Sequence, residues 1–275
     1  MIELNNYQFL QYNININIDQ NQNTIIYSPN SNVLKKLALE IAGINKSEGI
    51  KYNGNDVYDN KAYFENRIYI DCNTKYLNTL LARNVQETME NSYNIIIDTN
   101  KFASLVKKLQ IRSCGELNND YTFTKEGIAL SDITLALSIY RYHLLFTPLE
   151  NITNEQHLNN VKEEIKNMNN LIFSTNLTNY KNISDLMIVL GFKKVFYLQD
   201  DSIIYIVKKI EERIINELDL TNNIIYKSNK STLCILDNKI SIETIKKLNI
   251  LGKLEKEKII NIDNIINGDK YEAEN

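Results

Sequence analysis

The sequence predicts an α/β protein in which strands and helices alternate along the chain. Residues 13–18 alternate polar and apolar side chains, which is typical of a strand with one buried face. Residues 24–27 form a short apolar run, and residues 33–41 place apolar side chains on one helical face. Two further apolar runs, 142–146 and 171–174, also predict buried strands. Alternation of this kind indicates strands and helices packed in layers.

The remaining elements follow in chain order. Between residues 28 and 32 the turn formers Ser-Pro-Asn-Ser-Asn separate the second strand from the first helix, and Gly43 stands where a helix C-cap glycine is expected. Other strands are predicted at 67–72, 186–190 and 195–198, a mainly helical stretch at 73–137 and a helix around 158–165. After residue 201 we expect a helix bearing Ile206, Ile210, Ile214 and Leu218, strands at 224–226 and 233–236, and helices near 242–248 and 259–266.

Length and composition fit one large domain, with or without a small appendage. The chain has 275 residues, of which 43% are hydrophobic and 24% charged, which allows a sizeable core. The net charge is −3 and the lysine pairs are scattered, so no basic stripe for nucleic acid is predicted. The most apolar run, 186–190, is too short to span a bilayer, so we expect membrane association only through a partner.

The cysteines favour a reducing compartment. Cys72, Cys114 and Cys234 lie far apart and show neither zinc spacing nor a disulfide framework. The N-terminus lacks the charged-then-apolar pattern of a signal peptide. We therefore expect a cytoplasmic protein, peripheral to a membrane if a partner places it there.

The turn and helix after the second strand carry a resemblance to a known family. Residues 28–36 read S-P-N-S-N-V-L-K-K and residues 37–43 read L-A-L-E-I-A-G. This stretch resembles the G-P-N-G-x-G-K-S-T and L-L-x-x-I-A-G segments of ATP-binding-cassette (ABC) subunits, without a gap. Residues 47–57, S-E-G-I-K-Y-N-G-N-D-V, resemble the segment that follows in that family.

The resemblance continues in order through residues 1–205. Residues 80–87 resemble the segment after the Q-loop, 144–156 the Walker B motif and D-loop, 171–177 the strand that ends in the switch histidine, and 185–195 the following strand pair. The resemblance implies a P-loop NTPase-like ABC ATPase domain over 1–205, with a helical subdomain at about 73–137. Residues 206–275 would form a small C-terminal α+β accessory region.

The residues that handle nucleotide in this family are replaced here. ATP binding needs glycines that let backbone N–H groups approach the phosphates, a lysine for the β- and γ-phosphates, and a hydroxyl for Mg²⁺. Ser28, Ser31 and Val33 stand at the glycine positions, Leu34 at the lysine position and Lys35 at the magnesium-serine position. We interpret the whole segment as a vestigial, non-functional phosphate loop: Ser28, Pro29, Asn30, Ser31, Asn32, Val33, Leu34 and Lys35.

The other motif positions are lost as well. Phe146 aligns with the Walker B aspartate, Thr147 with the general-base glutamate and Thr175 with the switch histidine. The Q-loop glutamine falls on Cys72 or Asn73, and the signature motif maps to residues 123–127, F-T-K-E-G. Phosphoryl transfer depends on positioning and charge compensation, so we predict no catalytic residue, no metal site and no cofactor.

These observations favour a pseudo-ATPase, an ABC-like subunit with a structural or regulatory role beside an active ABC subunit, a membrane permease, or both. One alternative is a divergent but active ATPase, in which Lys35 replaces the missing lysine, Glu150 supplies a metal ligand, and ATP and Mg²⁺ are bound. The other is a soluble binding protein that reuses the fold without a transporter. The residues leave the transported substrate and the partner open.

Overall fold

A computed structural model of the chain describes residues 1–73, 91, 95–109, 124–208, 210–228, 233–250 and 254–274, with side chains in the last helix up to residue 268. Cys114, the segment 80–87 and the first residue of the mapped signature, Phe123, lie outside the described residues.

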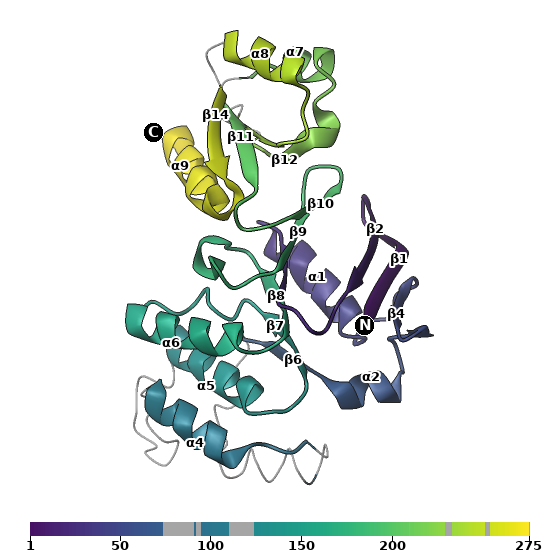
Figure 1. Ribbon diagram of the computed structural model, residues 1–275, viewed down its shortest axis with the longest axis vertical. Coiled ribbons are helices and arrows are strands. Elements are labelled where there is room, and N and C mark those ends of the chain that lie inside the picture. The colour runs from purple at the N-terminus through teal and green to yellow at the C-terminus, as the bar shows by residue number, and fades with distance from the viewer. Residues whose placement is uncertain are drawn as a thin grey trace.

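A six-stranded sheet forms the centre of the fold (Figure 1), in the order β10-β9-β3-β8-β7-β6. Its strands are β3 (Thr24–Tyr27), β6 (Arg67–Asp71), β7 (Tyr142–Phe146), β8 (Asn170–Ser174), β9 (Leu186–Leu190) and β10 (Val195–Leu198). All neighbours pair parallel except β10, which pairs antiparallel with β9. Every residue of β3, β7 and β8 is buried, as expected of parallel strands covered on both faces.

An N-terminal antiparallel sheet and helix α1 cover one face of the central sheet. The sheet has the order β2-β1-β4-β5, from β1 (Ile2–Phe9), β2 (Tyr12–Ile18), β4 (Ile50–Tyr52) and β5 (Asn55–Asp56). Helix α1 (Ser31–Ile41) buries Leu34, Leu37, Ala38 and Ile41, and the short α2 (Lys61–Asn66) precedes β6. Gly43 has the positive φ of 69° required of a helix-ending glycine, as predicted.

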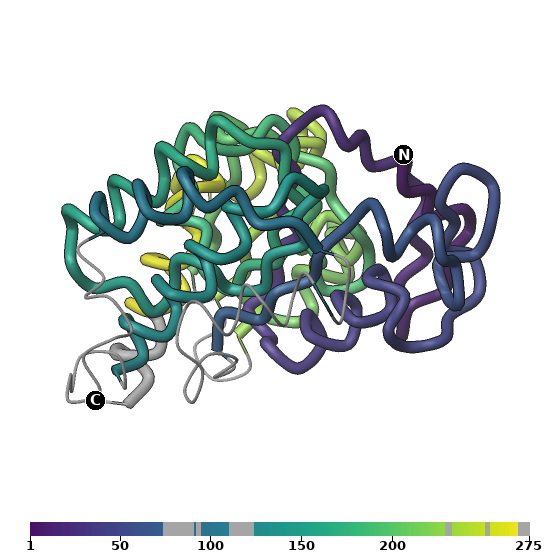
Figure 2. Tube along the Cα trace, turned by 90° about the horizontal axis from the view of Figure 1, so that it is seen from below, coloured from purple at the N-terminus to yellow at the C-terminus, as the bar shows by residue number. Residues whose placement is uncertain are grey.

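The opposite face of the central sheet is covered by helices from the middle of the chain. They are α4 (Thr99–Lys108), α5 (Lys125–Leu137) and α6 (Glu155–Lys166). In Figure 2 the N-terminal segment, purple and dark blue, lies on the side opposite to the teal segment that contains α5 and α6. Within the predicted helical stretch 73–137, α4 and α5 are the long helices among the described residues. The layered α/β architecture predicted from the sequence is confirmed.

A second α+β unit follows the central sheet and occupies the top of Figure 1. Its sheet has the order β12-β13-β11-β14, from β11 (Ile203–Val207), β12 (Ile224–Lys227), β13 (Cys234–Asp237) and β14 (Leu254–Lys258). Its helices are α7 (Glu212–Glu217), α8 (Ile242–Ile250) and α9 (Ile262–Glu274). We call residues 203–274 the C-terminal appendage. The boundary predicted after residue 205 falls inside β11.

The predicted helix through Ile206, Ile210, Ile214 and Leu218 is wrong. Residues 203–207 form β11, which pairs with both β13 and β14, and the helix α7 is confined to Glu212–Glu217. The run I-I-Y-I-V is rich in β-branched residues, which fit a strand between two neighbours. The four apolar residues are spaced four positions apart, as on one face of a helix, only because strand β11 and the short helix α7 follow each other closely in the chain. Strands β1, β4, β5 and β14 were not predicted.

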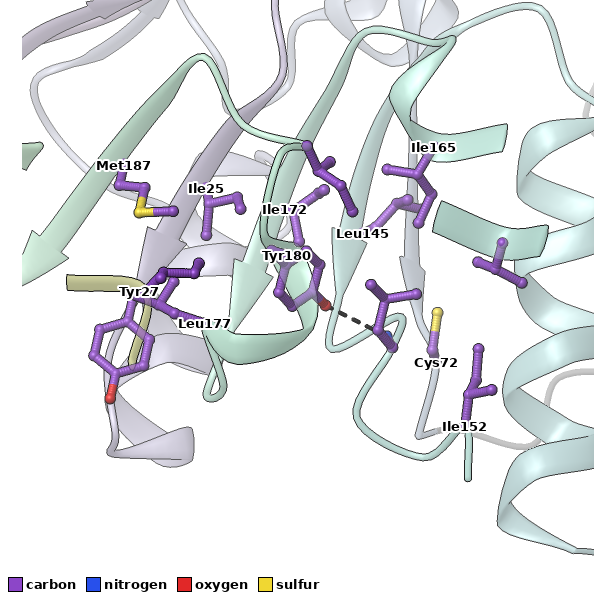
Figure 3. Packing of buried hydrophobic residues seen from close by; sticks show 14 of the residues in the cluster. Ile25, Tyr27, Cys72, Leu145, Ile152, Ile165, Ile172, Leu177, Tyr180 and Met187 are labelled. Carbon is purple, nitrogen blue, oxygen red and sulfur yellow. Dashed lines mark hydrogen bonds between the residues drawn. The ribbon is translucent and has the colours of Figure 1, made fainter. Parts of the chain in front are cut away.

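The appendage shares a hydrophobic core with one face of the central sheet. Ile259, Ile262 and Ile266 belong to the same buried cluster as Ile25 and Tyr27 of β3. Figure 3 shows part of this cluster, with the side chains of Tyr27 and Leu177 close to each other. No helix among the described residues is both long and apolar enough to cross a membrane.

Candidate functional site

The segment that would form a phosphate loop is mostly helical. Strand β3 ends at Tyr27 and helix α1 already begins at Ser31, so the connection consists of Ser28, Pro29 and Asn30. Asn30 is the N-cap of the helix, with an extended backbone. The predicted loop positions from Ser31 to Lys35 therefore lie on the first turns of helix α1.

Five backbone N–H groups of this segment already have acceptors within the protein. The side-chain oxygen of Asn30 accepts from Asn32 N at 3.1 Å and from Val33 N at 3.2 Å. The N–H of Leu34 donates to the carbonyl of Asn30 at 3.0 Å. The N–H of Asn30 donates to the Ser28 hydroxyl at 3.2 Å, and that of Ser28 to the carbonyl of Ser174 at 3.2 Å. An incoming phosphate would have to displace the Asn30 cap, which occupies two of these donors.

Leu34 is part of the hydrophobic core. Its side chain is fully buried, in the cluster formed with Leu37, Ile26 and the N-terminal sheet. Because α1 begins at Ser31, residue 34 is the fourth residue of the helix and points towards this core. A lysine at this position would place its ammonium group among apolar side chains.

Lys35 and Asp71 form an ion pair at the carboxyl edge of the sheet. Lys35 Nζ lies 2.9 Å from Asp71 Oδ2, with the lysine side chain half exposed and the aspartate side chain 3% exposed. Asp71 is the last residue of β6, and its other oxygen accepts from Asn73 N at 3.0 Å. Lys35 thus neutralises a buried carboxylate, although about half of its own side chain is exposed.

The side chains at the carboxyl end of β7 are neutral. Phe146 is buried, and Thr147 adopts a φ of 48°. A positive φ is unfavourable for a β-branched residue and costs roughly 1–3 kcal/mol. The Thr147 hydroxyl accepts from Asn73 Nδ2 at 2.6 Å, and Asn73 Oδ1 accepts from Asn151 Nδ2 at 2.6 Å. Neither Phe146 nor Thr147 offers a carboxylate to a metal ion or a water molecule.

Glu150 is held by neighbouring donors. Its Oε1 accepts from the Ser174 hydroxyl at 2.6 Å and from Thr175 N at 3.1 Å. Its Oε2 accepts from the Tyr180 hydroxyl at 2.9 Å and from Leu149 N at 3.1 Å. Burial raises the pKa of the Glu150 carboxyl despite these hydrogen bonds. With both oxygens engaged, Glu150 does not fit the metal-ligand role that the divergent-ATPase alternative requires.

A second buried carboxyl, Asp132, lies close to the ion pair. Asp132 on α5 is 1% exposed, and its Oδ2 has no hydrogen-bond partner. Burial and the nearby charge of Asp71 raise the pKa of Asp132 to about 8. Burial and three surrounding carboxylates likewise raise the pKa of the Cys72 thiol well above its usual value, so the thiol stays protonated.

The N-terminus of α5, which contains the described part of the mapped signature, presents an acidic residue. Glu126 Oε1 contacts His157 Nδ1 at 3.0 Å, and Oε2 accepts from the Thr153 hydroxyl at 2.5 Å. Burial opposes ionisation of Glu126, but its hydrogen bonds from Thr153, His157 and Asn154 lower its pKa overall. A carboxylate that stays ionised at this position repels a phosphate group.

The predicted residues thus come together at one edge of the central sheet. Phe146 is the last residue of β7, and the loop positions, Thr147 and Thr175 directly follow the carboxyl ends of β3, β7 and β8. The sequence did not indicate Asp71 or Asp132, since each is a single carboxylate within an apolar stretch. Among the described residues, no group of three or more His, Cys, Asp or Glu side chains is arranged to hold a metal ion.

Comparison with known proteins gives matches in structure but not in sequence. No family model matches the chain, and no curated protein matches it. A protein described as a cobalt transport ATP-binding protein, CbiO-2, superposes with a TM-score of 0.59 at 18% identity, covering 90% of this chain and 100% of its own. The dimeric cassette MJ0796 bound to ADP and Pi has a TM-score of 0.53 at 13% identity, covering 72% and 98%.

A third structure is described as a metal-chelate type ABC transporter in an inward-facing conformation. It has a TM-score of 0.50 at 10% identity and covers 86% of this chain and 96% of its own. At these identities the likeness establishes the fold. The resemblance noted in the sequence is therefore confirmed at that level, and this chain has the fold of an ABC-transporter ATP-binding cassette.

Proposed function

We propose that this chain is an ABC-transporter-like subunit that does not hydrolyse ATP and serves a structural or regulatory role beside an active cassette, a membrane permease, or both. The observation that carries the proposal is the conformation of residues 28–35. A helix that starts at Ser31 and is capped by Asn30 replaces the loop that would cradle the phosphates. From the similar structures, which are described as ATP-binding and transporter proteins, the proposal carries over the association with a transporter but not the binding of ATP.

The charges near the sheet edge support the same proposal. ATP binding needs a lysine for the phosphates and oxygen ligands for Mg²⁺. Leu34 is buried at the lysine position, and Lys35 brings a fixed positive charge to the magnesium-serine position, where it pairs with Asp71. A metal cation bound at this position would be repelled by the positive charge of the Lys35 ammonium group. The residues present therefore do not fit Mg²⁺–ATP.

A contribution to a partner's ATP site is also disfavoured. In the family that the sequence resembles, the signature motif of one subunit faces the nucleotide of its neighbour. Here the described part of that segment carries Glu126, whose carboxylate is hydrogen-bonded to Thr153 and His157. A negative charge at this position would oppose the γ-phosphate of the partner's nucleotide. This supports a structural or regulatory role over that of an asymmetric ATPase.

The proposal is tested by measuring phosphate release. The purified chain is incubated with millimolar Mg²⁺–ATP, alone and with an active ABC cassette from the same source. The proposal predicts no turnover by the chain alone. If the chain acts beside an active cassette, it should form a complex with that cassette, which analytical ultracentrifugation detects. Turnover by the chain alone that is abolished by Lys35→Ala would support the divergent-ATPase alternative instead.

A further inference from the structure

The C-terminal appendage contacts the central domain next to the vestigial loop. Helix α9 carries Asp263 in its first turn, and this residue is 6% exposed. Asp263 Oδ1 accepts from the Tyr27 hydroxyl at 2.8 Å, and Oδ2 accepts from Leu177 N at 2.5 Å. Thr178 adds a weaker hydrogen bond, from its hydroxyl to the carbonyl of Ile260 at 3.4 Å.

The two groups that Asp263 binds belong to the segments that follow neighbouring strands. Tyr27 is the last residue of β3, and the connection to α1 begins at Ser28. Leu177 follows β8, three residues beyond Ser174. Strands β3 and β8 pair parallel with Tyr27 opposite Ser174, so both connections leave the same edge of the sheet. Figure 3 shows Tyr27 and Leu177 side by side at this edge.

Apolar packing surrounds this polar contact. Ile259, Ile260 and Ile262 are buried in the same cluster as Tyr27 and Leu177. Burial raises the pKa of the Asp263 carboxyl, while hydrogen bonds from Tyr27 and Leu177 counteract that rise. A buried carboxylate is stable in such surroundings only while its donors stay in place. Moving α9 away would leave Asp263, the Tyr27 hydroxyl and the Leu177 N–H without partners at the same time.

We propose that helix α9 holds the β3–α1 connection and the segment after β8 in a fixed position relative to each other, and that Asp263 is the positioning residue of this contact. The contact lies within one chain and needs no nucleotide, so the inference goes beyond the proposed function. Any partner that displaces α9 would release both connections, and any partner that shifts them would strain the α9 contact. The appendage is thereby coupled to the edge of the sheet that carries the vestigial site.

The test is amide hydrogen exchange on the full chain, in three single variants and one double variant. Tyr27→Phe removes only the hydroxyl and keeps the packed ring, and Asp263→Asn keeps the size but places an amide against one donor. Tyr63→Phe is the matched control, because the Tyr63 hydroxyl is also buried and donates to the carbonyl of Ile41 at 2.7 Å.

Loss of a buried hydrogen bond to a carboxylate changes a local opening equilibrium by roughly tenfold or more. We expect exchange at residues 30–34 and 175–180 to accelerate about tenfold in Tyr27→Phe and in Asp263→Asn. In the double variant, exchange at these segments should accelerate by less than the product of the two single effects. The control should leave both segments unchanged. The proposal would be overturned if the exchange rates at both segments were unaltered in both single variants, or if exchange in the β1–β2 hairpin accelerated equally. It would also be overturned if the acceleration in the double variant equalled the product of the two single effects.

Discussion

Replacing Leu34 by lysine tests directly whether residues 28–35 still behave as a phosphate loop. In a functional loop, this substitution would restore the lysine that binds the β- and γ-phosphates. In the structure, the Leu34 side chain is fully buried in the core between α1 and the N-terminal sheet. We therefore predict that Leu34→Lys loses stability and gains no affinity for ATP.

The expected magnitude follows from the burial of Leu34. The substitution replaces the branched leucine by a longer, unbranched stem that packs poorly and adds an ammonium group that has no partner in the core. We expect a total loss of about 4–6 kcal/mol, a large part of the 5–15 kcal/mol by which folded domains are stable. Leu34→Met keeps the apolar volume and should cost less than about 1.5 kcal/mol.

The assay is urea-induced unfolding followed by far-ultraviolet circular dichroism, since the chain has no tryptophan. Asn32→Lys serves as a second control, because Asn32 is exposed on the same helix and a lysine there should cost at most about 1 kcal/mol. The reasoning is refuted if Leu34→Lys unfolds within about 1 kcal/mol of the original protein and binds Mg²⁺–ATP more tightly.

Three further substitutions test separate parts of the site. Asn30→Ala removes the helix cap and should lower the free energy of unfolding by about 1 kcal/mol without creating ATP affinity; no loss of stability in urea would contradict the assigned cap. Lys35→Met leaves the buried Asp71 carboxylate unpaired and should lower stability by about 1–2 kcal/mol; an unchanged urea midpoint would show that the ion pair is unimportant. In the folded chain the Asp132 carboxyl keeps its proton up to about pH 8, whereas in the unfolded chain it loses the proton near pH 4. The stabilisation that protonated Asp132 contributes to the folded state is therefore fully present below about pH 4 and is lost as the pH rises towards 8. Asp132→Asn should therefore raise stability at pH 8 more than at pH 5, by about 3–4 kcal/mol, and equal effects at both values would refute the shifted pKa.

The order of strands and helices in the central domain could be predicted from local patterns. The period-two alternation of 13–18 and the apolar runs at 24–27, 142–146 and 171–174 each correspond to an observed strand. Prediction failed at 203–207, because the isoleucines of β11 and α7 happen to share a helical spacing. Only the pairing of β11 with β13 and β14, which is not local, decides in favour of the strand.

The site could be predicted only in part, for the same reason. The missing glycines and the leucine at the lysine position are visible in the sequence, and so is an asparagine able to cap a helix at Asn30. Its consequence, a helix beginning at Ser31, was not predicted, because the apolar face begins only at Val33. Lys35 and Asp71 are 36 positions apart in the printed sequence, and Tyr27 and Asp263 are 236 apart, so no local pattern indicates either contact.

The central claim is that the segment between β3 and α1 no longer binds nucleotide. Its most direct test is equilibrium binding of Mg²⁺–ATP to the purified chain by titration calorimetry, carried to millimolar ligand. The capped helix, the buried Leu34 and the Lys35–Asp71 pair predict no detectable heat of binding. Saturable binding at micromolar concentration, weakened by Lys35→Ala, would contradict the claim and support an active, divergent ATP site.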